Sequence, residues 1–95
     1  MQLKSFNVTG TGATLAIADA ALGVPKMCKW FQFLNVDGAV LTIGGSDVDA
    51  THGYPITATG ANFQPPMSQS MEFYDLEATY FFLTTSANGV LLCAV

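Results

Sequence analysis

The stretch KMCKWFQFLNV, residues 26–36, carries the clearest structural signal in this chain. It is rich in aromatic residues and holds no glycine or proline, which is typical of a β-strand. Alternation predicts one face with Cys28, Trp30, Gln32, Leu34 and Val36, and another with Met27, Lys29, Phe31 and Phe33. Because both faces are largely apolar, we expect a strand that is central in a sandwich or that packs its second face against a partner.

Two turn signals follow strong strands. Asp37-Gly38 lies between apolar runs, and Asn88-Gly89 lies between TYFFLTT (residues 79–85) and VLLCAV (residues 90–95). Such pairs are typical of tight hairpins, which need positive φ. We therefore predict that residues 39–43 pair with the strand at residues 26–36, and that the last strand, residues 90–95, pairs with residues 79–85.

The remaining chain gives weaker signals. Residues 13–17 favour a strand, residues 67–73 alternate imperfectly, and YDLEA (residues 74–78) indicates one helical turn with Asp75 as its cap. Pro65-Pro66 marks a corner. With about seven or eight short strands and no crossover helix, the sequence predicts an all-β antiparallel sandwich or small barrel, in a single domain over residues 1–95. The apolar last strand should pair within the sheet or join another subunit's sheet.

Charge is scarce in this sequence. Charged residues make up 11% of the 95, against about 25% in ordinary domains, and the net charge is −4. Part of the surface should therefore face protein rather than water. Lys4, Lys26 and Lys29 are scattered, so nucleic acid is not an expected partner. The sequence shows no signal peptide or membrane span, which predicts synthesis in the cytoplasm and no membrane partner.

The segment GGSDVDATHGYP, residues 44–55, holds the candidate binding residues Asp47, Asp49, His52 and Tyr54. An EF-hand starting at Asp47 fails, because its sixth and twelfth positions are His52 and Ala58 rather than glycine and an acid. A looser calcium site from the two aspartates stays open, whereas zinc usually takes more histidine or cysteine. The density of Gly and Asp favours a turn-rich surface loop, with no cofactor.

Catalytic residues are not expected. Ser46, Asp49 and His52 could be written as a triad, but one loop offers no rigid scaffold to orient the base. Cys28 and Cys93 lie in apolar runs, where we expect buried, free and unreactive thiols; a disulfide would require that their strands are neighbours. The sequence therefore does not favour an enzyme.

Aromatic residues cluster between positions 73 and 82. Alternation prevents Tyr80, Phe81 and Phe82 from all facing inward, and an exposed ring often marks an interface. The candidate interface residues are Phe73, Tyr74, Tyr80, Phe82, Leu92 and Val95. Exposed rings can also stack on sugars.

The chain resembles small structural proteins of tailed bacteriophages. The resemblance rests on Trp30, on the run GGSDV with Ala50, Gly53 and Pro55, and on the later Asp75, Leu76 and Tyr80. It implies a non-enzymatic virion component with a jelly-roll-like β-sandwich. The paucity of charge in this chain departs from that pattern and leaves the mode of attachment open.

These observations lead to three hypotheses. The first is a capsid decoration or cement protein that binds the major capsid protein or other virion proteins through apolar surface and self-associates, as a trimer for instance. The second is a neck, tail or head-fibre base component of the virion. The third is a small carbohydrate-binding sandwich, calcium-dependent through Asp47 and Asp49.

Overall fold

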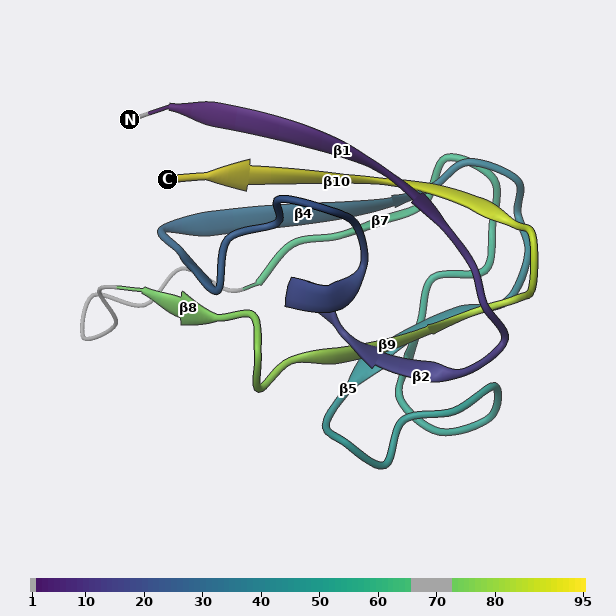
Figure 1. Ribbon diagram of the computed structural model, residues 1–95. Helices are drawn as coiled ribbons and strands as arrows, with labels where there is room; N and C mark the ends of the chain where they lie inside the picture. The colour runs from purple at the N-terminus through teal and green to yellow at the C-terminus, as the bar shows by residue number, and fades with distance from the viewer. Residues whose placement is uncertain (1, 66–72) are drawn as a thin grey trace.

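The computed structural model describes residues 2–65 and 73–95 and is built almost entirely from antiparallel strands (Figure 1). Sheet A contains, in spatial order, β1 (Leu3–Thr9), β10 (Asn88–Ala94), β4 (Trp30–Asn35) and β7 (Asn62–Phe63). Sheet B contains β2 (Thr14–Ala16), β9 (Tyr80–Leu83), β5 (Leu41–Gly44) and β6 (Tyr54–Pro55). A short pair, β3 (Met27–Cys28) with β8 (Tyr74–Asp75), and the 3-10 turn η1 (Ile17–Asp19) complete the elements. The predicted all-β antiparallel class is confirmed, although the short elements bring the strands to ten rather than seven or eight.

The strand order is that of a jelly roll. If the eight strands of the two large sheets are numbered along the chain, sheet A reads 1-8-3-6 and sheet B reads 2-7-4-5. The first strand pairs with the last, the second with the seventh, the third with the sixth and the fourth with the fifth, all antiparallel. This is a long hairpin rolled into two facing sheets, which gives the double-sheet sandwich that jelly rolls share.

Both hairpin predictions are wrong for one topological reason. The strand before Asp37-Gly38 lies in sheet A and the strand after it in sheet B, so the turn joins the sheets instead of closing a ladder. The predicted turn at Asn88-Gly89 is in fact the start of β10. The chain crosses between the sheets just before it, where the Ala87 N–H donates a hydrogen bond to the Thr84 carbonyl (3.0 Å). In a jelly roll most consecutive strands lie in opposite sheets.

Asn35 ties the sheets together at this crossing. Its side chain is fully buried; its Nδ2 donates to the carbonyls of Ala39 (2.7 Å) and Ile56, and its Oδ1 accepts the Gly38 N–H (2.9 Å). Next to it, Asp37 accepts hydrogen bonds from the backbone N–H (2.7 Å) and the side-chain amide (3.1 Å) of Asn88. A buried polar side chain is stable only when it is hydrogen-bonded, and here those bonds hold the turn between the sheets.

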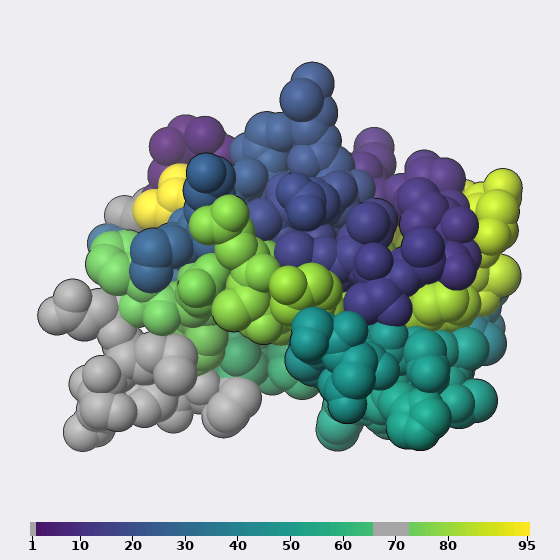
Figure 2. Space-filling view, turned by 60° about the horizontal axis from the view of Figure 1, so that its bottom comes forward, coloured from purple at the N-terminus to yellow at the C-terminus, as the bar shows by residue number. Residues whose placement is uncertain are grey.

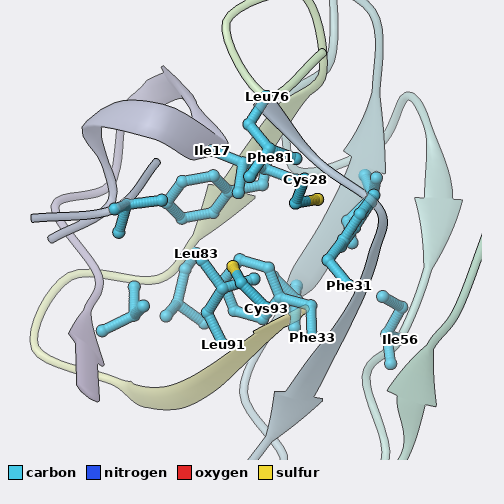
Figure 3. Close-up of a cluster of buried hydrophobic side chains, with 14 of the residues drawn as sticks. Ile17, Cys28, Phe31, Phe33, Ile56, Leu76, Phe81, Leu83, Leu91 and Cys93 are labelled. Carbon is cyan, nitrogen blue, oxygen red and sulfur yellow. The ribbon is translucent and has the colours of Figure 1, made fainter. Parts of the chain in front are cut away.

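The core fills the space between the sheets (Figure 3). Sheet A contributes Phe31, Phe33 and Leu91, and sheet B contributes Phe81 and Leu83, all at most 1% exposed. The rings of Phe33 and Phe81 lie 5.0 Å apart at a tilt of 50°, a favourable aromatic geometry. The prediction that Phe31 and Phe33 share one face of β4 is therefore confirmed, and that face is the one toward the core.

The single long strand expected over residues 27–36 is interrupted at Lys29. Cys28 in β3 is buried, and so is Phe31 in β4, although they are three positions apart and strict alternation would put them on opposite faces. The Lys29 N–H donates to Ala94 of β10 (2.8 Å), outside both elements. This break shifts the alternation of inward and outward side chains by one residue. The predicted shared face of Cys28 and Trp30 is therefore wrong.

Other expectations have mixed outcomes. The strand expected at residues 13–17 is shorter, Thr14–Ala16, because Ile17 begins η1. YDLEA forms β8 followed by a tight turn, so the predicted helical turn with Asp75 as its cap is wrong. Asp75 instead closes the tight turn, since its Oδ1 accepts the Glu77 N–H at 2.9 Å. Of the segment expected at residues 67–73, all but the last residue lies outside the described residues.

Candidate functional site

The segment between Gly44 and Pro55 joins β5 to β6, which are paired neighbours in sheet B. It folds back over the outer face of this sheet. Val48 is 2% exposed and lies over Gly44 and Gly53, where an added Cβ would meet the Val48 side chain. The Thr14 hydroxyl donates to the Val48 carbonyl, and the Thr42 hydroxyl donates to the Asp49 carbonyl (2.6 Å). The loop therefore serves as a cover for this sheet, visible as the teal surface at the lower right of Figure 2.

Asp49 organises the exposed end of the loop. Its Oδ1 accepts hydrogen bonds from the N–H groups of Thr51 (2.9 Å) and His52 (2.8 Å) and lies 2.8 Å from the His52 Nδ1. The Thr51 N–H first, and then the His52 ring, lower the pKa of Asp49 to about 2. The hydrogen bond to Asp49 raises the pKa of His52 in turn. This is an Asx-type turn closed by a side-chain ion pair in water.

The predicted loop residues do not converge on a binding centre. The His52 and Asp49 side chains are 72% and 52% exposed, so their pairing is screened by solvent. In residues 2–65 and 73–95 no group of three or more His, Cys, Asp or Glu side chains is placed to hold a metal ion. Tyr54 lies apart from this pair, at the start of β6, where its ring is 63% exposed.

Tyr54 lines a shallow groove at the open edge of the sandwich. The groove measures about 400 Å³ and is lined by Tyr54, Asn62, Phe63 and Gln64. Tyr54 and Phe63 meet edge to face, with ring centroids 5.7 Å apart. The Gln64 Nε2 donates to the Asn62 Oδ1 at 3.3 Å. The groove thus combines two rings with two carboxamides and brings together the edge strands of both sheets.

The two cysteines are free and buried in the core, as the sequence predicts. Their thiols interact, and the hydrogen bond with Cys28, together with burial, raises the pKa of Cys93. A thiol held protonated in an apolar interior is a poor nucleophile. Cys93 packs in the core between the sheets.

The predicted interface residues are distributed over different surfaces. Tyr80 and Phe82 lie half-buried on the outer side of β9, while Phe81 between them faces the core. Tyr74 packs edge-on against Phe31 at 6.0 Å, and Val95 packs against the core.

Phe73, just before β8, is 45% exposed. Leu92 points outward from sheet A. The six candidates thus do not form one patch.

The outer face of sheet A gathers residues from four strands, and the sequence pattern indicated only its β4 part. The strand register aligns Leu3 with Ala94 and Trp30, Ser5 with Leu92 and Gln32, and Asn7 with Val90 and Leu34. The strand register places on the outer side of this sheet Leu3, Ser5, Asn7, Thr9, Trp30, Gln32, Leu34, Asn62, Asn88, Val90, Leu92 and Ala94. Of these, Ala94 is itself fully buried. None of them is charged. We call this surface the A face.

An apolar stripe runs across the A face. Trp30, Leu34, Val90 and Leu92 are each half-buried, and Leu3 is 58% exposed. No described segment of the chain is hydrogen-bonded over the A face in the way that the loop is bonded over sheet B.

Comparison of the chain with protein-family models, curated proteins and solved structures gives no match. The described residues contain no helix with the length and hydropathy needed to cross a membrane.

Proposed function

We propose that this chain is a non-enzymatic structural protein of a bacteriophage virion, and that it binds the assembled capsid through the A face as a decoration or cement protein. The observation that carries the proposal is the A face itself, twelve outward positions without a charge on a domain with few charges anywhere. Its apolar stripe would be buried against the shell, at about 25 cal/mol per Å² of apolar area.

The fold is compatible with this role but does not establish it. Jelly rolls serve as viral capsid domains and also as lectin domains, so topology alone does not select a function. The low charge and the resemblance to phage structural proteins favour the virion. A repeated, modest interface also suits a shell, because a subunit that touches several neighbours gains avidity.

Binding to capsids that lack this protein tests the proposal. The capsids are those of the phage whose genome encodes the chain. Leu92→Glu places a carboxylate at the centre of the apolar stripe and should weaken co-sedimentation with these capsids at least about tenfold, because a buried unpaired charge is costly. Ala50→Glu makes the same change in charge on the exposed loop over sheet B and should bind as the wild type does. Equal binding by both variants would remove the A face from the proposal.

The location in the particle separates the capsid from the neck, tail or fibre base. Quantitative mass spectrometry of purified virions gives the copy number of the chain relative to the major capsid protein. A number that scales with the shell supports decoration, whereas a single ring of copies supports the neck or tail.

Carbohydrate binding is the second candidate function, favoured by the groove of Tyr54, Asn62, Phe63 and Gln64. Exposed rings stack on the apolar faces of sugars, and carboxamides hydrogen-bond to pairs of hydroxyls. A glycan array with and without chelator tests this alternative and its proposed dependence on calcium through Asp47 and Asp49. Tyr54→Ala should abolish a true signal, and the absence of signal in both conditions would reject the alternative.

A further inference from the structure

The edge strand β1 differs from the other free edges of the two large sheets. It is seven residues long, whereas the edge strands β2, β6 and β7 have three, two and two residues. Very short edges are a common protection against pairing with other chains, and so are prolines and bulges. β1 contains no proline. It also contains no bulge, because it pairs with β10 in continuous register from Leu3 to Thr9.

The hydrogen bonds of β1 show which backbone groups stay free. Gln2 and Val95 exchange both of their backbone hydrogen bonds (3.2 and 2.8 Å), and the Gly10 N–H donates to Ala87 (2.8 Å). In an antiparallel ladder these bonded positions recur at every second residue. The even-numbered residues of β1 therefore bond to β10, and the N–H and C=O groups of Leu3, Ser5, Asn7 and Thr9 point away from the sheet.

We propose that β1 pairs antiparallel with β1 of a second copy of this chain, about a two-fold axis at Phe6. The geometry defines the register. Pairing about Phe6 places Leu3 opposite Thr9 and Ser5 opposite Asn7 of the second copy, and it uses the outward groups of all four residues. Shifting the axis to Ser5 or Asn7 leaves one of these four without a partner in β1 of the other copy.

The side chains fit the same axis. Phe6 is half-buried, packs against the core and lies at the edge of the sheet. Facing non-hydrogen-bonded residues approach closely, so the two Phe6 rings would meet and gain burial from each other. Lys4, the one charge of β1, would lie opposite Val8 of the second copy rather than opposite another lysine, so like charges are not brought together.

The consequence is a sheet that continues from one copy into the next. Sheet A of each copy joins that of its partner into an eight-stranded sheet, and the two A faces become one uncharged surface. A two-fold pairing of this kind closes on itself and does not grow into fibres. The inference goes beyond the proposed function and does not depend on what the A face binds.

Proline at position 7 tests the pairing. Asn7→Pro removes an N–H that points away from β10, so it should leave the folded chain intact, as prolines on edge strands do. Each dimer would lose two hydrogen bonds, and we expect the dimer dissociation constant from sedimentation equilibrium to rise at least about tenfold. Asn7→Ala, which keeps the N–H, should stay within about twofold.

Amide hydrogen exchange supplies the second measurement. As the wild-type concentration rises, the amides of Leu3, Ser5, Asn7 and Thr9 should gain protection, while those of Phe6 and Val8 are protected throughout by β10. The protected Phe6 and Val8 amides also verify that Asn7→Pro is folded. Isotope-filtered spectra should show Lys4 of one copy in contact with Val8 of the other.

Three results would overturn the inference: a wild type that stays monomeric at millimolar concentration, a dimer unaffected by Asn7→Pro, or a contact of Lys4 with Phe6 of the second copy in place of Val8. Capsid binding by the dimer-deficient variant remains a separate question. Failure of the pairing is therefore distinguishable from failure of the A face, which Leu92→Glu tests.

Discussion

The outer faces of the two large sheets differ in whether a described segment of the chain covers them. Sheet B is covered by the loop between β5 and β6, which seals Thr42 and Val48 from water at 3% and 2% exposure. No segment within residues 2–65 and 73–95 is hydrogen-bonded over sheet A in this way, and its Trp30, Leu34 and Leu92 are half-buried. The difference teaches that apolar residues on an outer face are not equivalent. Where a loop covers them they contribute to folding, and where no described segment covers them they remain partly exposed to solvent.

The largest expected effect concerns the link between the sheets. Asn35→Ala should lower the free energy of unfolding by about 3 kcal/mol, because the Gly38 N–H and the carbonyls of Ala39 and Ile56 lose a buried partner. Asn62→Ala, at an exposed position of the same sheet, should stay within about 0.5 kcal/mol of the wild type. Urea denaturation measures both variants, and equal costs would show that Asn35 does not hold the crossing.

The same substitution on both outer faces tests the contrast directly. Val48→Ala removes two methyl groups from under the loop and should cost about 2 kcal/mol. Val90→Ala makes the identical change on the A face, where the side chain is half-buried, and should cost less than about 1 kcal/mol. Thermal and urea unfolding of the two variants would contradict the comparison if Val90→Ala were the more costly.

Asp49 and His52 should produce the smallest effect. The hydrogen bond to Asp49 raises the pKa of His52 above its ordinary 6.5, so its contribution to stability is present below that pH and is lost as the pH rises through the raised pKa. The lowered pKa of Asp49 acts in the opposite direction, and its contribution is lost as the pH falls toward about 2.

An NMR titration of the His52 ring should therefore give a pKa above 6.5 that returns toward its ordinary value in Asp49→Asn. Because both groups are exposed, the unfolding temperature should change little with pH around neutrality. A His52 pKa that is unaffected by Asp49→Asn would show that the two side chains do not pair in solution.

Gly10 illustrates a constraint that could not be seen in the sequence. A Cβ at this position would lie 2.0 Å from the Thr84 carbonyl oxygen, because the crossing from β1 to β2 passes against the crossing from β9 to β10. The sequence indicates only a glycine near a strand end. The close approach depends on two segments more than seventy positions apart.

The class of fold and much of the core were predictable from local pattern. Alternation in WFQFLN placed Phe31 and Phe33 on one face and Trp30 and Leu34 on the other, because side chains on a strand alternate whatever the topology. The structure decided that the face with Phe31 and Phe33 is the buried one. The long Gly- and Asp-rich segment between residues 44 and 55 was recognised as a loop. These features depend on residue type and spacing alone.

Which strands pair with one another was decided by the tertiary structure. Asp37-Gly38 supplies the positive φ that a turn needs, but whether that turn closes a ladder or crosses to the other sheet depends on which strands bury each other's faces. The buried Asn35, the break at Lys29 and the uncharged A face all follow from that choice, because each involves strands distant in the sequence. The residues alone determined that this chain forms strands with apolar faces. Only the rolling of eight strands into two sheets decided which faces form the core, which face the loop covers, and which face no described segment covers.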